Sequence, residues 1–483
     1  MISPGRRWLS GRIIPRTVRA RTVASRWRSV HPGQARSKFL RSGYYPDSSP
    51  AVSAVRHRAV QANPIPQRVL VLGAGLTGVT SAWYLRQAGF EVAVVDRQPD
   101  AAQETSFANG GQISVSHPEP WSNPSAPATI LKWLGRADAP LLVRPRLDPA
   151  LWRWALAFAR ECLPSRSERN TRAIAALAIH SRACLRALRA QLPLDYRQRS
   201  AGILHLLRDS QELRAAQRRM VTLGALGITT ELLDRAGCER IEPALAGDLE
   251  PLAGALYAAD DESGDARCFA QQLAAHARAA GVRFSFDASV SALCIDQGRV
   301  TGAWVCTRGE RRRVDADAVV VCLGSHSPRF VPSGSKLSIY PVKGYSVTVS
   351  PASPELAPKV SLTEESRRIV CSRLGEKVRI AGTAELAGFD LGPNPSRSGA
   401  LLDWFERHFP AAGRVEEAEH WCGLRPTTPS NVPHIGAGAL PGLWLNTGHG
   451  SLGWTLSCGS AQCLSELMQG RAPQPDFPFL ARS

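Results

Sequence analysis

The sequence predicts an α/β protein that combines a β-α-β unit with an antiparallel sheet, and three features point to it. At residues 68–96, a buried strand, a glycine-rich turn and a helix follow one another. Residues 315–324, DADAVVVCLG, form a second apolar strand that ends at a glycine. Apolar and polar residues alternate at residues 345–349, 367–372 and 377–381, which is typical of antiparallel strands. Strands of both kinds in one chain predict a mixed α/β architecture.

The β-α-β unit is the most complete of these features. Residues 68–72 are β-branched and apolar, as in a strand buried on both faces, and helical spacing continues over residues 79–87. Gly89 ends the helix, and residues 91–95 form a second strand. This order of elements is that of the Rossmann-type unit.

Three glycines and one acid in this unit predict a dinucleotide site. Gly73 permits a tight turn, Gly75 lets the backbone approach a pyrophosphate, and Gly78 lets helix and strand pack closely. The helix N-terminus adds unpaired N–H groups for the phosphates. Asp96 ends the second strand, where a carboxylate grips a ribose hydroxyl and disfavours a 2′-phosphate. The alternative is a β-α-β unit without a ligand.

Composition describes a chain long enough for two or three domains. It has 483 residues, of which 44% are hydrophobic and 21% charged, and it contains no run of 18 apolar residues. Its 11 cysteines include no C-x-x-C pair. We therefore expect buried free thiols in a reducing compartment and no metal site.

The net charge of +18 is concentrated at the N-terminus. Residues 1–67 hold 13 Lys and Arg against one acid, Asp47, so they contribute +12 and leave +6 for the other 416 residues. We expect residues 1–66, rich in Arg, Ser and Pro, to be disordered. Three interpretations stay open: a dispensable segment from a start placed too far upstream, an organelle-targeting segment, and a basic arm for anionic lipid or nucleic acid.

The middle of the chain is predicted to be mostly helical between residues 120 and 250. Residues 147–163 form a basic aromatic helix, either a core helix with a charged edge or one lying on a membrane surface. Residues 170–191 form an amphipathic helix, and residues 200–207 a strand. Further expected elements are strands at 254–257, 289–296, 300–307 and 443–446, and helices at 265–280, at 400–409 and from 453 onward.

A second G-x-G-x-x-G lies at Gly448, Gly450 and Gly453. It follows a strand and opens a helix, but neither a second strand nor a suitably spaced acid comes after it. We therefore expect a helix N-terminus that points at an electron-rich group of the same cofactor.

Several long strings, in this order, resemble one family. They are VLGAGLTGVTSAWYLRQAGFEVAVVDR, ETSFANGGQIS, YPVKGYSVT, WCGLRPTTP and WLNTGHGSLGWTLSCGS. From about Arg68 to Gly470 the chain resembles the bacterial D-amino acid dehydrogenase small-subunit family, within the D-amino acid oxidase and glycine oxidase superfamily. The resemblance implies a Rossmann-type FAD-binding domain, discontinuous in sequence, at residues 67–120, 250–335 and 430–475. It also implies an α+β substrate domain on an antiparallel sheet at residues 121–249 and 336–429.

The resemblance also implies the site residues. Those expected to bind FAD are Gly73, Gly75, Leu76, Thr77, Gly78, Asp96, Arg97, Ser106, Asn109, Gly110, Gly111, Gln112, Gly324, Gly448, Gly450, Ser451, Leu452 and Gly453. Arg425 matches the arginine that clamps the substrate carboxylate, a task that suits a bidentate guanidinium. Tyr345 and Tyr340 are weaker candidates than Arg425, for a second contact. His449 is the third catalytic candidate, although its place suits a hydrogen bond to the flavin ring better.

One departure from the family pattern follows GLRPTTP. The family usually continues with Asp-Gly, whereas this chain has Ser430-Asn431. This leaves FAD binding intact and changes the expected charge near the active site.

The function implied is FAD-dependent oxidation of a D-amino acid to a 2-oxo acid and ammonia. Hydride would pass from Cα to flavin N5, and the electrons to a quinone or an electron-carrier protein; oxygen stays open as an acceptor, although the resemblance favours a dehydrogenase over an oxidase. The expected location is the cytoplasm, either free or peripheral on the inner face of the plasma membrane. The alternatives are oxidation of D-proline or 4-hydroxy-D-proline, an RNA-modifying flavin oxidase, and a non-catalytic interaction protein. No nucleic-acid partner is expected, because most of the charge lies in the N-terminal segment.

Overall fold

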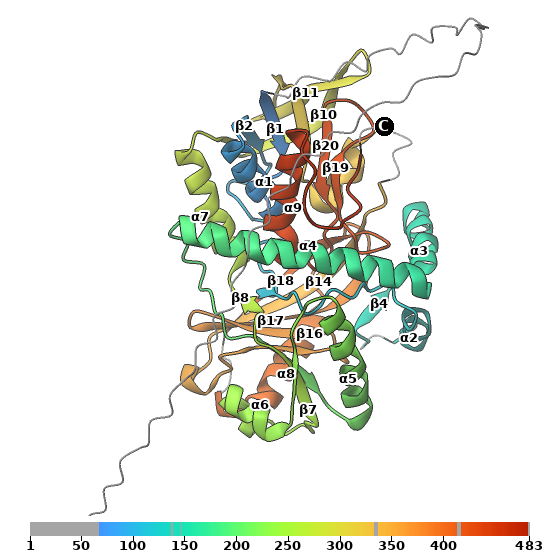
Figure 1. Cartoon of the computed structure of the whole chain (residues 1–483), viewed down its shortest axis with the longest axis vertical. Coiled ribbons are helices and arrows are strands. Elements are labelled where there is room, and N and C mark those ends of the chain that lie inside the picture. Colours follow the sequence, from blue (N-terminus) through green and yellow to red (C-terminus); the bar gives the residue numbers. More distant parts are fainter. Residues whose placement is uncertain (1–66, 137–138, 145, 333–336, 413–416, 482–483) are drawn as a thin grey trace, which may run out of the picture. The chain divides into compact units, whose positions relative to one another are not determined.

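The computed structural model describes residues 67–136, 139–144, 146–332, 337–412 and 417–481, all within one compact unit that begins at Asn63 (Figure 1). The basic extension expected at residues 1–66 lies outside the described residues.

A six-stranded sheet carries the glycine-rich turns. Its order is β19-β20-β13-β1-β2-β9; all neighbours are parallel except β19, which is antiparallel to β20. The strands are β1 (Arg68–Leu72), β2 (Glu91–Val95), β9 (Arg283–Ser285), β13 (Ala318–Val321), β19 (His434–Ala437) and β20 (Leu443–Thr447). Parts far apart in the chain therefore meet in one sheet, because parallel strands need long crossovers.

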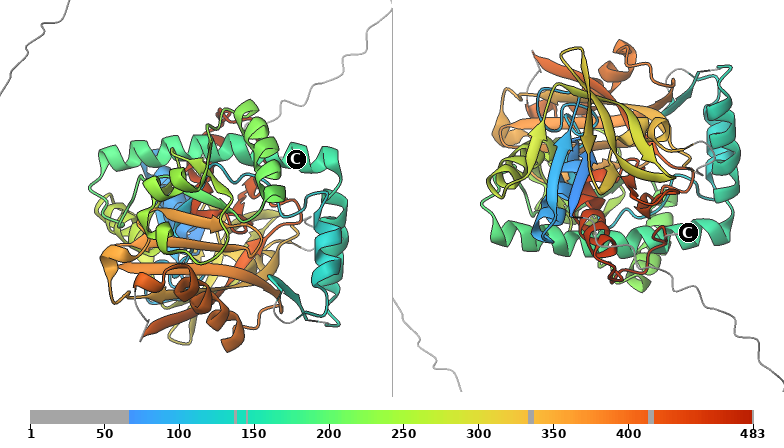
Figure 2. Two further views of the ribbon diagram at one scale, coloured as in Figure 1. Left: turned by 90° about the horizontal axis from the view of Figure 1, so that it is seen from below. Right: turned by 90° about the horizontal axis from the view of Figure 1, so that it is seen from above.

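The two faces of this sheet are covered differently (Figure 2). On one face Val69 and Val71 of β1 pack with helices α1 (Leu76–Gln87), α7 (Ala266–Ala279) and α9 (Gly453–Met468), and the long α4 (Pro164–Gln191) packs on α9. On the other face Leu70 and Leu72 pack against an antiparallel sheet of β10 (Ala288–Asp296), β11 (Arg299–Thr307) and β12 (Glu310–Asp315). Successive strand residues point to opposite faces, so the buried part of β1, residues 69–72, must be apolar on both faces.

A second, largely antiparallel sheet of nine strands has the order β18-β14-β17-β16-β15-β5-β7-β6, with β4 beside β17. The strands are β4 (Leu141–Val143), β5 (Ile203–Leu207), β6 (Glu231–Leu233), β7 (Gly254–Ala258), β14 (Tyr340–Val349), β15 (Ser361–Glu364), β16 (Ile369–Leu374), β17 (Lys377–Leu386) and β18 (Ala418–Thr427). Helix α8 (Pro395–His408) covers one face, where Leu401 and Trp404 pack with Val347 and Ile380.

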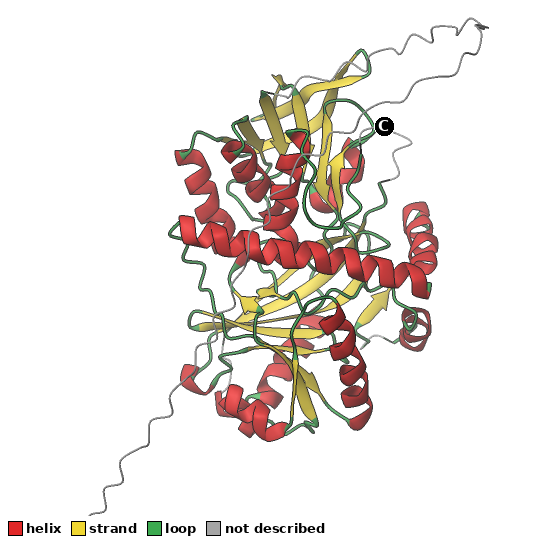
Figure 3. Cartoon of the chain, viewed as in Figure 1, coloured by secondary structure: helices red, strands yellow, loops and turns green. Residues whose placement is uncertain are grey.

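The remaining elements are mostly helical (Figure 3). They are α2 (Ala126–Trp133), α3 (Pro149–Glu161), α5 (Ser210–Ala225), α6 (Arg235–Ile241), the 3-10 turns η1 (Pro243–Gly247), η2 (Gly324–Phe330), η3 (Pro354–Leu356) and η4 (Pro410–Ala412), and the paired short strands β3 (Gln112–Ile113) and β8 (Glu262–Ser263). Asp265 caps α7, accepting from the amides of Arg267 and Cys268 at 2.9 and 3.1 Å. The side-chain oxygen thereby satisfies two amides that have no partner within the helix.

The α/β class with a Rossmann-type unit and an antiparallel sheet is confirmed. The domain boundaries stay a prediction; β7, expected in the FAD-binding part, pairs in the nine-stranded sheet, and α4, expected in the substrate part, packs on α9. All 11 cysteines are free thiols, and most are buried. Within the described residues, none of the helices is long and apolar enough to cross a membrane.

Candidate active site

The first glycine turn depends on close backbone contacts. Gly73 has φ of +98° and donates from its amide to the Val95 carbonyl at 2.8 Å. A Cβ on Gly78 would lie 1.8 Å from the Gly73 carbonyl oxygen, so strand and helix approach as closely as expected. At Gly75 the nearest atom of the described residues, apart from its chain neighbours, is the Ser106 hydroxyl oxygen, 3.7 Å from the Cβ position. The turn is therefore closed around Gly73 and Gly78 and open at Gly75.

The open side of this turn faces a cavity of about 470 Å³, called here the cofactor cavity. Gly75 caps α1 without a side chain, and the first turn of α1 carries no acid. The Ser106 hydroxyl oxygen accepts a hydrogen bond from the Leu76 amide at 3.1 Å. The helix therefore presents backbone N–H groups and a partial positive charge to the cavity, as a pyrophosphate requires.

Asp96 lines the cofactor cavity beside the same turn. Its carboxylate accepts from the Ala74 amide at 2.6 Å and from the Gln98 amide at 2.8 Å. Burial raises the pKa of Asp96, against the effect of these two amides. A half-buried carboxylate fixed by backbone amides fits the ribose contact that the sequence predicts.

The second glycine turn reaches the cofactor cavity from the other side. Gly448 and Gly450 have φ of +85° and +55°, and both line the cavity together with Gly453 at the start of α9. The Gly450 amide donates to the Pro426 carbonyl at 2.9 Å, which ties the turn to the end of β18. The two glycine turns thus lie on one cavity, and together they fit a dinucleotide with a second aromatic ring system.

His449 lies in this turn, but its imidazole points toward α9. Its Nε2 is 3.1 Å from the Ser460 hydroxyl, and the residue is 3% exposed. Burial, and then the neighbouring His434, lower the pKa of His449 to about 3. The side chain is therefore neutral at physiological pH.

A second cavity of about 240 Å³, called here the substrate cavity, adjoins the first. Five residues line both: Thr105, Asn109, Trp421, Gly423 and Gly450. Its apolar side chains include Trp121, Ile130, Trp133, Leu141 and Phe158 from the region around α2 and α3, and much of the rest of its lining comes from the nine-stranded sheet and its loops, which contribute Glu365, Arg368 and Arg425. A cavity that combines apolar surface with a few placed polar groups is the usual form of a small-molecule site.

Two arginines line the substrate cavity: Arg368, which pairs with Glu365, and Arg425. Arg425 lies on β18, and its guanidinium crosses the intervening strand β14 to donate a hydrogen bond to the Thr383 carbonyl on β17 at 2.8 Å. The guanidinium can cross there because Gly344 has no side chain; a Cβ at this position would lie 2.4 Å from the Arg425 Cζ. Opposite Gly344 the pairing of β14 with β17 shifts register, and Thr383 has φ of +51°. This bulge turns the carbonyl toward the guanidinium.

Within the described part of the chain, no carboxylate pairs with the Arg425 guanidinium. Burial alone lowers the pKa of Arg425 to about 10. A half-buried cation without an anionic partner is partly desolvated at a cost, and a bound carboxylate would offset this cost. The side chain therefore fits the carboxylate of a ligand.

The two tyrosine candidates are engaged elsewhere. Tyr345 lines the substrate cavity, but its hydroxyl donates to Glu385 at 2.6 Å. Burial, and then Glu385, raise the pKa of Tyr345. The Tyr340 hydroxyl donates to Asp148 at 3.0 Å. Tyr345 thus reaches the site through its ring, and a substrate contact through its hydroxyl would require it to leave Glu385.

The expected flavin-side residues divide between the two cavities. Ser106 and Asn109 line the cofactor cavity, as do Leu76, Thr77, Arg97 and Gly324. Gly110, Gln112, Ser451 and Leu452 line the substrate cavity instead, and Gly111 lines neither but packs against Ser372. The Gln112 amide donates to the Leu362 carbonyl at 3.1 Å and to the Thr363 hydroxyl at 2.9 Å, so it fixes this segment to β15.

Two residues that hold the cavity walls in place, Thr105 and Asn431, were not among the site residues expected from the sequence. Thr105 holds the segment in place by donating to the Leu424 carbonyl at 2.8 Å. Asn431, at the departure from the family pattern, has φ of +59° and accepts the Trp121 amide at 3.0 Å through its side chain. Asparagine tolerates this left-handed conformation, so here it supports the wall of the substrate cavity. In the sequence, the only indication of this role was that Asn431 stands where the family usually has a glycine.

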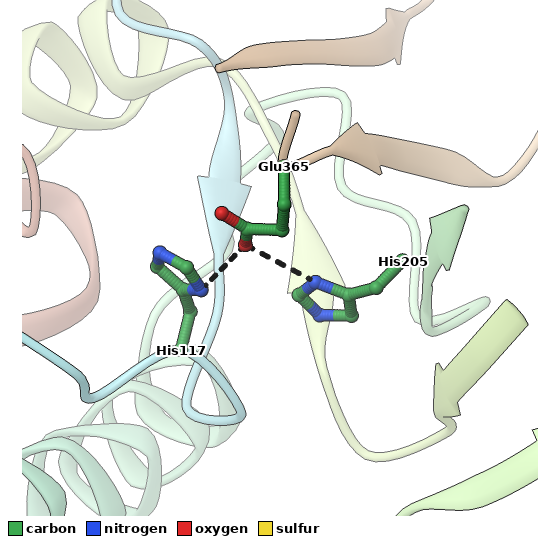
Figure 4. Close-up of side chains that lie close together, drawn as sticks. All are labelled: His117, His205 and Glu365. Carbon is green, nitrogen blue, oxygen red and sulfur yellow. Dashed lines mark ion pairs between the residues drawn. The ribbon is translucent and has the colours of Figure 1, made fainter. Parts of the chain in front are cut away.

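A cluster of three potential metal ligands lies beside the substrate cavity (Figure 4). The Glu365 Oε1 lies 3.0 Å from the His117 Nδ1 and 3.9 Å from the His205 Nδ1. However, Arg219 approaches the His117 Nδ1 to 2.7 Å and the Glu365 Oε1 to 3.6 Å, and Arg368 pairs with Glu365 at 3.2 Å. These guanidinium groups already supply the positive charge beside Glu365, so the arrangement is an ion-pair network. The expectation that the chain has no metal site stays a prediction.

Comparisons with known proteins agree with this geometry. Residues 68–467 match the family described as FAD dependent oxidoreductase. A D-amino acid dehydrogenase of Dechloromonas aromatica is 52% identical over 415 residues, covering 86% of this chain and 99% of that protein. A D-amino acid dehydrogenase of Paramagnetospirillum magneticum is 49% identical over 406 residues, covering 84% of this chain and 95% of that protein. The structure of glycine oxidase from Bacillus cereus, 23% identical, superposes with a TM-score of 0.64 over 84% of this chain and 95% of its own.

Proposed function

The chain belongs to the FAD dependent oxidoreductase family, so its cofactor is FAD, and from this premise we propose that it oxidises D-amino acids to 2-oxo acids and ammonia. The observation that carries the proposal is the guanidinium of Arg425: it is half-buried, has no carboxylate partner within the described residues, and lies in a cavity that adjoins the cofactor cavity. A zwitterionic amino acid offers the anion that this cation lacks.

The residues of the chain act mainly by binding and orientation. Bound FAD supplies the acceptor for two electrons, taken as a hydride from the substrate Cα. Arg425 holds the carboxylate, and its own orientation comes from the Thr383 carbonyl. The apolar wall with Trp121 and Phe158 excludes water from the substrate side. Fixing the reacting carbon in one orientation accounts for a large part of such a rate enhancement.

No side-chain base is assigned in this proposal. His449 is buried and engaged by Ser460, and the Tyr345 hydroxyl is engaged by Glu385. The substrate reacts as the neutral amine and gives an imino acid, which water hydrolyses. His449 and Tyr345 then act through the shape of the site, while Arg425 remains the substrate contact.

A cyclic secondary amine such as D-proline or 4-hydroxy-D-proline is the second candidate substrate. It carries the same carboxylate, so Arg425 does not separate the two. The two candidates can be distinguished by mixing the purified enzyme anaerobically with D-alanine or with D-proline, because only a substrate bleaches the flavin absorbance. Bleaching by D-alanine with release of pyruvate and ammonia supports oxidation of primary amines; bleaching by D-proline alone supports the second candidate.

The basic N-terminal segment bears on the RNA-modifying alternative and on location. We propose that residues 1–66 do not take part in catalysis. We also propose that the enzyme is cytoplasmic or peripheral on the inner face of the plasma membrane, and that it passes its electrons to a quinone or an electron-carrier protein. A chain that starts at residue 67 should therefore retain full D-amino acid oxidation. Loss of activity in that chain would favour a substrate recognised by the basic segment.

A further inference from the structure

Arg368 is the second arginine on the substrate cavity, and the proposed function leaves it without a task. Its side chain is 40% exposed, although it pairs with Glu365. Its Nη1 donates to the Glu365 Oε2 at 3.2 Å, and no other hydrogen bond joins its guanidinium to the described residues. A guanidinium carries five N–H donors. Several donors therefore remain available beside the substrate.

The turn that carries Arg368 lies close to the Arg425 guanidinium. Ile369, the next residue, pairs with Gly382 of β17. Arg425 donates to the carbonyls of Gly382 and Thr383 at 3.5 and 2.8 Å. Paired strands lie about 5 Å apart, so the two arginines reach the cavity from adjacent parts of one sheet. Arg368 also has φ of +54°, which glycine or asparagine adopts more readily, and such an outlier on a cavity points to a role for its side chain.

Glu365 offers a hydrogen-bond acceptor next to these donors. It lines the same cavity, and its side chain is 31% exposed. Its Oε1 is buried toward His117 and Arg219, whereas its Oε2 pairs with Arg368. Burial opposes its charge, but His117, His205 and Arg368 outweigh burial and hold the pKa of Glu365 well below its usual range. Glu365 is therefore a carboxylate at physiological pH.

The charges around the cavity decide between a charged and a neutral ligand group. Arg219 pairs with Glu119 at 2.7 Å, and Arg368 pairs with Glu365 at 3.2 Å, so each of these cations has an anion. Arg425 has none within the described residues, and the substrate carboxylate takes that place. A second carboxylate would add uncompensated negative charge. A neutral group that both accepts and donates hydrogen bonds fits the pair better.

We propose that Arg368 and Glu365 bind a carboxamide at the end of the substrate side chain, so that the enzyme favours D-asparagine or D-glutamine over apolar D-amino acids of the same shape. The amide oxygen accepts from the Arg368 guanidinium, and the amide NH2 donates to the Glu365 carboxylate. Arg425 holds the α-carboxylate at the same time. This inference rests on the proposed function and names the class of side chain that the cavity selects.

Pairs of substrates with equal shape test this selection in the FAD-loaded enzyme. D-leucine has the shape of D-asparagine, and D-homoleucine has that of D-glutamine, but neither carries an amide. For at least one pair we expect the wild type to have the higher kcat/KM with the amide, and the ratio to fall at least tenfold in Arg368→Met, because the analogue without the donor leaves polar groups unpaired. Arg368→Lys, which retains N–H donors, should recover part of the ratio.

Arg235→Met is the matched control. Arg235 is 44% exposed, pairs with Glu239 at 2.8 Å and lines neither cavity. This variant should keep the ratios of the wild type. Ratios in Arg368→Met within about threefold of the wild type for both pairs would overturn the proposal, and so would a wild type that prefers the apolar member of both pairs.

Binding without turnover separates this inference from the proposed function. Succinamate and glutaramate correspond to D-asparagine and D-glutamine without the amino group, and their binding can be followed through the absorbance of the oxidised flavin. We expect the Kd of at least one of them to weaken at least tenfold in Arg368→Met. An unchanged Kd for both would overturn the carboxamide site. If no D-amino acid reduces the flavin, the proposed function fails instead, and these two Kd values still test the site.

Discussion

The Arg425 Nη1 donates a hydrogen bond to the Thr383 carbonyl across 2.8 Å, although their strands are not neighbours in the sheet. Strand β14 lies between them, and its residue at the crossing is Gly344. The missing side chain at Gly344 and the bulge at Thr383 together orient the guanidinium. The carboxylate contact of the proposed substrate therefore depends on three strands.

Gly344→Ala should weaken substrate binding. Its Cβ would lie 2.4 Å from the Arg425 Cζ and must displace the guanidinium. We expect KM for D-amino acids to rise roughly 10- to 100-fold, about 1.4 to 2.8 kcal/mol, with FAD content unchanged. Steady-state kinetics on the purified holoenzyme measures this. The control Gly399→Ala, whose Cβ in α8 meets no atom within 4 Å, should leave KM unchanged.

Gly75 and Gly78 should respond differently to alanine. Gly78→Ala places a Cβ 1.8 Å from the Gly73 carbonyl oxygen, so we expect a loss of roughly 3 kcal/mol or more in the free energy of unfolding. Gly75→Ala meets only the Ser106 hydroxyl, at 3.7 Å, and should fold normally while binding FAD more weakly. Thermal unfolding and FAD content after gel filtration distinguish the two effects. Equal stability of both variants would contradict the close contact.

His449 should not contribute an ionisation to catalysis. Its pKa is lowered to about 3 by burial, so it stays neutral throughout the neutral range. We expect His449→Gln to keep the shape of the profile of kcat/KM against pH between about pH 5 and 9, whatever its effect on the absolute rate. The disappearance of an ionisation step from that profile in the variant would assign His449 a proton-transfer role.

Glu364 should stabilise the nine-stranded sheet in a pH-dependent way. It accepts from Arg208 and from the Trp404 indole, each at 2.8 Å. Burial opposes its charge, but His408, Arg208 and Trp404 outweigh burial and lower the pKa of Glu364 from 4.5 to about 2. Because the folded-state pKa is below the unfolded one, this stabilisation is complete above about pH 4.5 and is lost as the pH falls toward 2.

Glu364→Gln leaves buried basic groups without their anion and should cost about 3 kcal/mol at pH 7. Urea unfolding at several pH values should show the difference from wild type shrinking between about pH 4.5 and 2. Glu376→Gln is the control, because the Glu376 side chain is 86% exposed and pairs only with Arg373 in the described region. It should change stability by less than about 0.5 kcal/mol. A difference that does not depend on pH would contradict the ionic origin.

The β-α-β unit could be predicted because its information is local. Strands 68–72 and 91–95 lie where the sequence placed them, since a buried strand must be apolar on both faces. Strand β12, ERRRVD, was missed because it is almost entirely exposed and polar. Strand β18 was missed because its exposed start, with Glu419 and His420, hides the alternation.

The site was predictable in part for a similar reason. Arg425 and the two glycine turns stand in recognisable strings, so the sequence placed them near a cofactor. The roles of Gly344 and Thr383 come from strand pairing and a bulge, which no local pattern reports. Glu385 likewise takes up the Tyr345 hydroxyl across the β14–β17 pair, so the second catalytic candidate is engaged by a contact invisible in sequence.

The most direct test of the account is anaerobic rapid mixing of D-alanine with the FAD-loaded wild type and Arg425→Ala. We expect the second-order rate constant for flavin reduction to fall about 1000-fold, equivalent to about 4 kcal/mol, because the carboxylate loses its charged partner. Arg425→Lys should restore part of the lost rate constant, since the lysine ammonium keeps the charge but cannot bind the carboxylate in a bidentate way. A rate constant for Arg425→Ala within about threefold of the wild type would contradict the placement of the substrate.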